Sequence, residues 1–187
     1  VTTQGRRIPI YREVFKVNGL KGRAKSFIAN LKKCLPSDRK AVFIMDAGFG
    51  EDWFEAIESH SCYWLVRARG KKYIKLTESE GWVDARELYE KAGSRAKNYS
   101  GAYITKRSPR ACRINMKKGI AISKRKRPDQ LPRNYNSANG NYKRLAKEPW
   151  VLSTNLPEEY KTTQIINFYR KRMQIEESFR DIKSHQF

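Results

Sequence analysis

The residues best suited to chemistry lie in the run YRKRMQIEESFRDIK, near the end of the chain. On a helix with about 100° between successive residues, four of its polar residues share an arc of about 60°, and these are Tyr169, Arg172, Glu176 and Lys183. An apolar stripe lies beside the arc, formed by Phe168, Ile175, Phe179 and Ile182. The border of a buried face can hold a partly desolvated ionic site. The alternative is an amphipathic helix in which Arg172 and Glu176 form an ordinary i,i+4 salt bridge.

A second candidate is Asp46, which directly follows the apolar run AVFIM. A short apolar run of this kind predicts a strand that is buried on both faces. A glycine-containing turn and a predicted helix at 51–59 come next. Open α/β sheets bind their ligands at the carboxyl ends of parallel strands, so this aspartate has the position of a ligand-binding group. The alternative is an aspartate that only caps the helix.

The basic residues point to a polyanionic partner. The net charge of +21 and the pI near 10.1 favour nucleic acid, with a ribosomal-type RNA-binding protein or a membrane-surface protein as the alternatives. Arg67 and Arg69 end a predicted buried strand at 62–69, where they would suit a phosphate backbone or be solvated surface charge. No apolar run reaches the roughly 20 residues of a spanning helix, and no signal peptide is visible. Three scattered cysteines indicate reduced thiols in a cytoplasmic protein.

The remaining elements follow from local patterns. Alternating apolar residues predict a hairpin strand and a following strand within 1–17, and a helix is expected at 23–34. Residues 70–145 form a separate block with short aromatic strands at 72–76, 102–105, 110–116 and 120–123, a short helix at 82–92 and a cation run at 124–127. A strand at 148–155 leads to the final helix, with Thr162 or Thr163 as its N-cap.

The spacing Tyr-x2-Arg-x3-Glu-x6-Lys at residues 169–183 resembles the signature of a large group of bacterial insertion-sequence DDE transposases, the Tn-five-like group. The run FIMDAGFG and the strand CYWLVRAR resemble the surroundings of that family's second catalytic aspartate, which places Asp46 at this position. The resemblance covers about residues 5–70 and 148–187, whereas the middle block resembles the family only in position and character.

The resemblance implies metal-dependent cleavage of transposon ends and strand transfer into target DNA. Asp46 and Glu176 would be catalytic carboxylates that ligate Mg²⁺, with Mn²⁺ as a substitute. Arg172 and Lys183 would bind DNA phosphates, with Tyr169 supporting the same region. Two such ions can stabilise the attacking and the leaving oxygen of a phosphodiester together. Trp150 occupies the position of a tryptophan that stacks on a flipped base in some members; a core role is the alternative.

The implied fold is α/β, a ribonuclease-H-like mixed sheet with flanking helices. Its parts would be a first core segment at 1–70, a β-rich insertion with a basic loop at 71–145, and a returning strand and signature helix at 146–187. The chain begins at Val1, after the point where the family carries its first catalytic aspartate on a central strand. We therefore expect a fragment that lacks this residue, binds DNA, and by itself cleaves DNA poorly or not at all.

The expected partner is double-stranded DNA, both transposon ends and target, bound by a homodimer of the full-length protein. The expected location is the bacterial cytoplasm, in association with the nucleoid. Two other interpretations stay open from the residues: a non-catalytic basic nucleic-acid-binding fragment, and another nuclease of ribonuclease-H-like fold.

Overall fold

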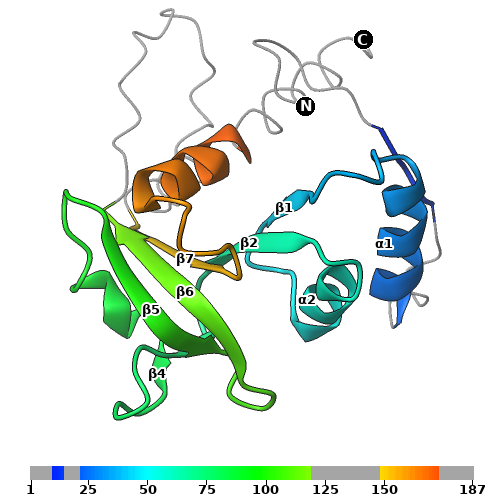
Figure 1. Cartoon of the computed structure of the whole chain (residues 1–187). Coiled ribbons are helices and arrows are strands. Elements are labelled where there is room, and N and C mark those ends of the chain that lie inside the picture. The colour runs from blue at the N-terminus through cyan, green and yellow to red at the C-terminus, as the bar shows by residue number, and fades with distance from the viewer. Residues whose placement is uncertain (1–9, 15–21, 119–147, 173–187) are drawn as a thin grey trace, which may run out of the picture.

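The computed structural model describes residues 10–14, 22–118 and 148–172. Seven strands in these residues form one sheet in the order β1-β2-β7-β6-β5-β3-β4 (Figure 1). The strands are β1 (Val42–Met45), β2 (Tyr63–Ala68), β3 (Tyr73–Lys75), β4 (Val83–Asp84), β5 (Lys97–Ile104), β6 (Arg110–Lys117) and β7 (Trp150–Thr154). β1 and β2 are parallel, and the other pairs are antiparallel. The sheet is therefore mixed.

Helices cover both faces of this sheet. They are α1 (Arg23–Lys33), α2 (Glu51–Glu58), a 3₁₀ turn η2 (Glu87–Tyr89) and a helix at 162–172. Successive residues of a strand point to opposite faces. Trp64 and Val66 of β2 accordingly join the core with α1 and α2, whereas Leu65 joins the core under the helix 162–172. This mixed α/β architecture is consistent with the predicted ribonuclease-H-like fold.

The larger core lies between the sheet and α2. The ring of Phe54 stacks on that of Trp64, with 4.4 Å between centroids and 23° between planes. Both side chains are fully buried, as is Ile57 one turn further along α2. α1 packs against α2 rather than directly on the central strands, and Ile28 enters the same core from it. The predicted helices at 23–34 and 51–59 are confirmed to within a residue of their ends.

β1 ends the sheet on one side within the described residues, where it pairs with β2 alone. An unpaired strand edge presents backbone N–H and C=O groups that can bond to another strand.

The middle block of the chain extends the core sheet. β7 lies between β2 and β6, so the strands β6, β5, β3 and β4 continue the sheet beyond it. The β-rich character expected for this block is confirmed for its described residues. The division of the chain into three parts stays a prediction. The predicted strand at 120–123 and the cation run at 124–127 lie outside the described residues.

Two local predictions are wrong. Residues 10–14 form no strand. Their alternation has another use, because Tyr11 packs edge-on against Phe27 of α1 at 5.1 Å and Glu13 pairs with Arg23 at 3.4 Å. The expected helix at 82–92 is a two-residue strand followed by the 3₁₀ turn η2.

The three cysteines are all free thiols. Cys62 and Cys112 are buried, and burial raises the pKa of the Cys112 thiol to about 12. A buried neutral thiol of this kind is a core residue without nucleophilic or metal-binding character. Within the described residues, none of the helices has the length and apolar character needed to cross a membrane.

Glu58, the last residue of α2, connects this helix to the sheet. Its Oε1 accepts a hydrogen bond of 2.7 Å from the indole N–H of Trp64, and its Oε2 pairs with Arg110 of β6. Replacing Glu58 by Ala would leave the indole N–H of fully buried Trp64 without this acceptor, so we expect a loss of about 1–3 kcal/mol in unfolding free energy. Urea denaturation measures it.

The matched control for this variant is Glu55→Ala, also on α2. Glu55 makes an exposed salt bridge to Lys25, and such surface pairs contribute little. We expect its denaturation curve to overlay that of the unchanged protein. Equal destabilisation by the two replacements would contradict a special role for Glu58.

Candidate active site

Asp46 stands at the carboxyl end of β1, as the sequence predicts. Its Oδ1 accepts a hydrogen bond of 2.9 Å from the N–H of Ala47, and its backbone carbonyl accepts one of 3.2 Å from Phe49. These bonds hold the turn that follows the strand. The side chain is 56% exposed, so a fixed carboxylate faces solvent at the edge of the sheet.

The pairing of β1 with β2 brings Arg67 beside Asp46. Met45 is opposite Val66 in the parallel register, and one further step places Asp46 level with Arg67. Both residues have the strand parity of the face that the helix 162–172 covers. The Arg67 side chain is only 11% exposed, which makes it a nearly buried cation next to the site.

The helix at 162–172 begins one or two residues earlier than the predicted N-caps, Thr162 or Thr163, imply. Its N-cap is Lys161 rather than a threonine, because the Gln164 side chain accepts a hydrogen bond of 2.8 Å from the Lys161 N–H. This is the return half of a capping box. Ile165 and Ile166 of its first turns are buried against Leu152 and other residues of the second core.

Tyr169 lies in the middle of the buried face of this helix, whereas the sequence places it at the border. It is 1% exposed, and its ring packs edge-on against that of Trp150 at 5.2 Å. Phe168, a residue of the predicted apolar stripe, is only half buried, so the buried face of the helix is turned toward Tyr169. Burial raises the pKa of the Tyr169 hydroxyl, while the nearby cations Arg172 and Arg67 oppose this shift.

Arg172 extends from the same helix toward Asp46. Its guanidinium carbon lies 5.4 Å from the centre of the Tyr169 ring, and its Nη1 is 3.8 Å from Asp46 Oδ2. The latter distance is an ion-pair contact and too long for a hydrogen bond. Three of the predicted site residues, Tyr169, Arg172 and Asp46, therefore meet at one point of the fold.

Glu148 is part of this neighbourhood, although the sequence analysis did not identify it. Its carboxylate lies 2.9 Å from Arg69 Nε and 3.6 Å from Arg67 Nη2. Arg67 and Arg69 are thus held on one side by an internal carboxylate. The signal for this pairing is the antiparallel register of β2 and β7, in which Ala68 faces Val151. Two separate sequence segments do not reveal that register.

Trp150 is 8% exposed and covered by Tyr169. A base can stack only on an exposed ring. In this conformation the buried ring favours the core alternative, and stacking on a flipped base stays a prediction.

Glu176 and Lys183 lie outside the described residues, so the structure describes one carboxylate of the predicted pair. Within the described ranges, no three His, Cys, Asp or Glu side chains gather as a metal site would require. Asp46 itself fits a divalent metal ion chemically, because it offers an exposed, hard oxygen ligand of the kind that Mg²⁺ prefers. Further ligands must come from other parts of the site.

One known protein family matches most of this chain. The family model described as "Transposase DDE domain" matches residues 14–187, which include α1, the whole described sheet and the helix 162–172. No curated protein and no solved structure matches the chain. The match covers more than half of the sequence, and the chain therefore belongs to the DDE transposase domain family.

Proposed function

We propose that this chain carries the catalytic centre of an insertion-sequence transposase of the Tn-five-like signature group, which cuts DNA at transposon ends and transfers the cut strand into target DNA. The observation that carries this proposal is the convergence of Asp46 with Arg172 and Tyr169 from distant parts of the chain. Family membership supports a DNA transposition enzyme that depends on a divalent metal.

Asp46 and Glu176 would hold Mg²⁺ in the proposed site, with Mn²⁺ as a substitute. When bound, the metal supplies the charge that stabilises a phosphodiester displacement. The 3.8 Å contact with Arg172 offsets part of the Asp46 charge at the edge of the sheet. We infer that Arg172 and Lys183 bind phosphate oxygens next to the scissile bond, where arginine offers a planar pair of donors.

Tyr169 acts through Arg172 in this proposal. Its buried ring lies under the guanidinium, and a cation over an aromatic face is stabilised by the ring quadrupole. Arg67 and Arg69 would contact the DNA backbone from the sheet side. The Glu148 carboxylate contacts both guanidinium groups and offsets part of their charge, so it competes with DNA phosphates for them.

The proposed partners are the two transposon ends and a target duplex, held by a homodimer of the full-length protein in the bacterial cytoplasm at the nucleoid. The net charge of +21 supports a polyanionic partner. Binding through phosphates releases counterions, so the affinity for DNA should fall steeply as the salt concentration rises.

The test combines the full-length protein with labelled DNA that carries the ends of its own element, and with a supercoiled target plasmid. We expect cleavage at the transposon end and joined products on the target when Mg²⁺ is present, and neither when EDTA removes it. Salt-sensitive binding without any metal-dependent cleavage would overturn the proposal in favour of a binding module. Cleavage without joining would indicate a plain nuclease.

A further inference from the structure

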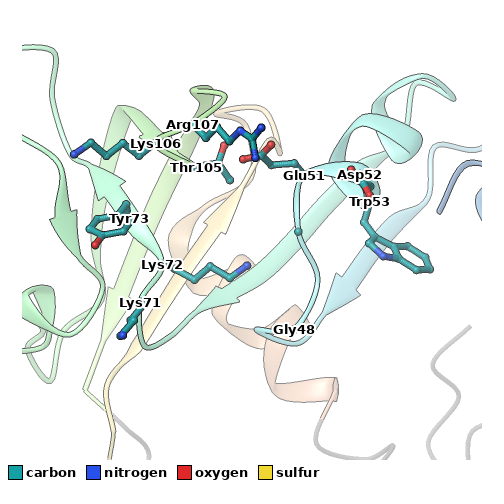
Figure 2. Close-up of a pocket in the computed structure, with 11 residues that line it drawn as sticks. Gly48, Glu51, Asp52, Trp53, Lys71, Lys72, Tyr73, Thr105, Lys106 and Arg107 are labelled. Atoms are coloured by element: carbon teal, nitrogen blue, oxygen red, sulfur yellow. The ribbon is translucent and has the colours of Figure 1, made fainter. Parts of the chain in front are cut away.

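An open groove of about 980 Å³ begins two residues beyond Asp46 (Figure 2). Three loops form it: the turn after β1 with the start of α2, the β2–β3 turn, and the β5–β6 turn. The β2–β3 and β5–β6 turns contribute four cations to its lining, Lys71, Lys72, Lys106 and Arg107, which we call the basic wall. The start of α2 contributes Glu51 and Asp52, which we call the acidic wall.

The basic wall is available to a ligand. Within the described part of the chain, none of its four cations forms a salt bridge with a carboxylate. Lys72 donates a hydrogen bond of 3.2 Å to the backbone carbonyl of Phe49, which fixes its position across the groove. Lys71, Lys106 and Arg107 are exposed. Four cations on two adjacent turns suit the closely spaced charges of a nucleic-acid backbone.

Tyr73 adds an aromatic platform to the groove. It is 45% exposed, an unusual exposure for a large ring, and it precedes the fully buried Ile74 on β3. The Lys106 ammonium lies 5.7 Å from the centre of its ring. An exposed ring beside backbone-binding cations is the arrangement on which unpaired bases stack.

The acidic wall favours binding of a single strand over binding of a duplex. A duplex has phosphates along both of its sides, so Glu51 and Asp52 would repel one of its strands. A single strand can turn its phosphates to the basic wall and its bases to the other side. The amino groups of bases then become donors for carboxylate oxygens, as the amino group of cytosine is.

We propose that this groove binds single-stranded DNA. Phosphates lie along the basic wall, one base stacks on Tyr73, and base amino groups reach Glu51 and Asp52. The assignment of this strand as the one unpaired beside the cut rests on the proposed function, because the groove starts at the turn that follows Asp46. Binding of single-stranded DNA itself requires neither metal nor cleavage.

The test measures binding of a fluorescent 15-nucleotide single strand and of the matching duplex to the full-length protein in EDTA. We expect Tyr73→Ala to weaken single-strand binding about 5- to 150-fold, the range typical of one lost stacking contact. Tyr73→Phe keeps the ring and should bind as the unchanged protein does. A bromodeoxyuridine-substituted strand should crosslink to Tyr73.

The basic wall is tested by the triple variant Lys71→Gln, Lys106→Gln, Arg107→Gln. Its control removes the same charge elsewhere, at the exposed Lys33, Arg39 and Lys118. We expect at least a tenfold greater loss of single-strand affinity in the groove variant than in the control. Equal losses, or crosslinks that avoid Tyr73, would overturn the proposal.

The acidic wall is tested by Glu51→Gln with Asp52→Asn, which keeps size and removes charge. We expect the duplex to bind more tightly to this variant, so that the affinities for the single strand and the duplex become more similar. An unchanged ratio of the two affinities would show that the acidic wall does not discriminate between a single strand and a duplex. Because these assays contain no metal, loss of strand transfer with intact groove binding would count against the proposed function alone.

Discussion

Replacing Asp46 by Ala in the full-length protein is expected to abolish cleavage of transposon ends while leaving their binding unchanged. This carboxylate is exposed and held at the carboxyl end of β1, and in the proposed function it is a ligand of the divalent metal. Loss of one metal ligand removes several kcal/mol of transition-state stabilisation, which corresponds to a rate lower by about 10³-fold or more. The initial rate of nicking in Mg²⁺ measures this effect, and gel shifts measure binding.

The matched control is Asp38→Ala. Asp38 is an exposed aspartate whose carboxylate pairs with its neighbour Arg39 in the loop after α1. The Asp38→Ala variant should nick DNA at the rate of the unchanged protein. Glu176→Ala should behave as Asp46→Ala does. If either active-site variant retained nicking at the level of the control, that residue would not be a metal ligand.

Replacing Tyr169 by Ala is expected to destabilise the fold by about 3–5 kcal/mol, the usual cost of deleting a buried aromatic ring. The ring is 1% exposed and packs against Trp150 on the side of its helix that faces the sheet. Urea or thermal denaturation followed by tryptophan fluorescence measures the loss. A surface residue that only contacted DNA would contribute far less to the unfolding free energy of the protein without DNA.

Tyr169→Phe is the matched control, since it keeps the ring and removes only the hydroxyl. We expect its stability to stay close to that of the unchanged protein. If Tyr169→Ala unfolded at the same urea concentration as the unchanged protein, the ring would not be a core residue and the border position predicted from the sequence would be restored.

The helix that contains Tyr169 shows how far a periodic pattern can be trusted. The spacing of polar residues predicted which positions share a face, and the polar residues Asn167, Arg170 and Lys171 are exposed. The pattern predicted an apolar stripe of Phe168, Ile175, Phe179 and Ile182, three of which come after the described residues. The sheet accepts Ile165, Ile166 and Tyr169 instead, since β2 and β7 offer Leu65, Trp150 and Leu152 to that side.

By itself the sequence determined the strands β1, β2 and β7, the helix after Asp46, and the placement of that aspartate at the end of a strand. These features depend on runs of four to eight neighbouring residues, where burial and backbone preference agree. The middle block was predicted as β-rich for the same reason. The predicted strand at residues 10–14 and the predicted helix at 82–92 were wrong, because short segments have weak structural preferences of their own.

Only the tertiary structure decided how these parts meet. The contact between Arg172 and Asp46, the burial of Tyr169 and Trp150, and the pairing of Glu148 with Arg67 depend on strand register and on how the helix packs across the sheet. The groove that begins at the turn after Asp46 likewise needs three loops from separate regions. Contacts between distant segments are set by the packing of the whole core, and no local pattern contains that information.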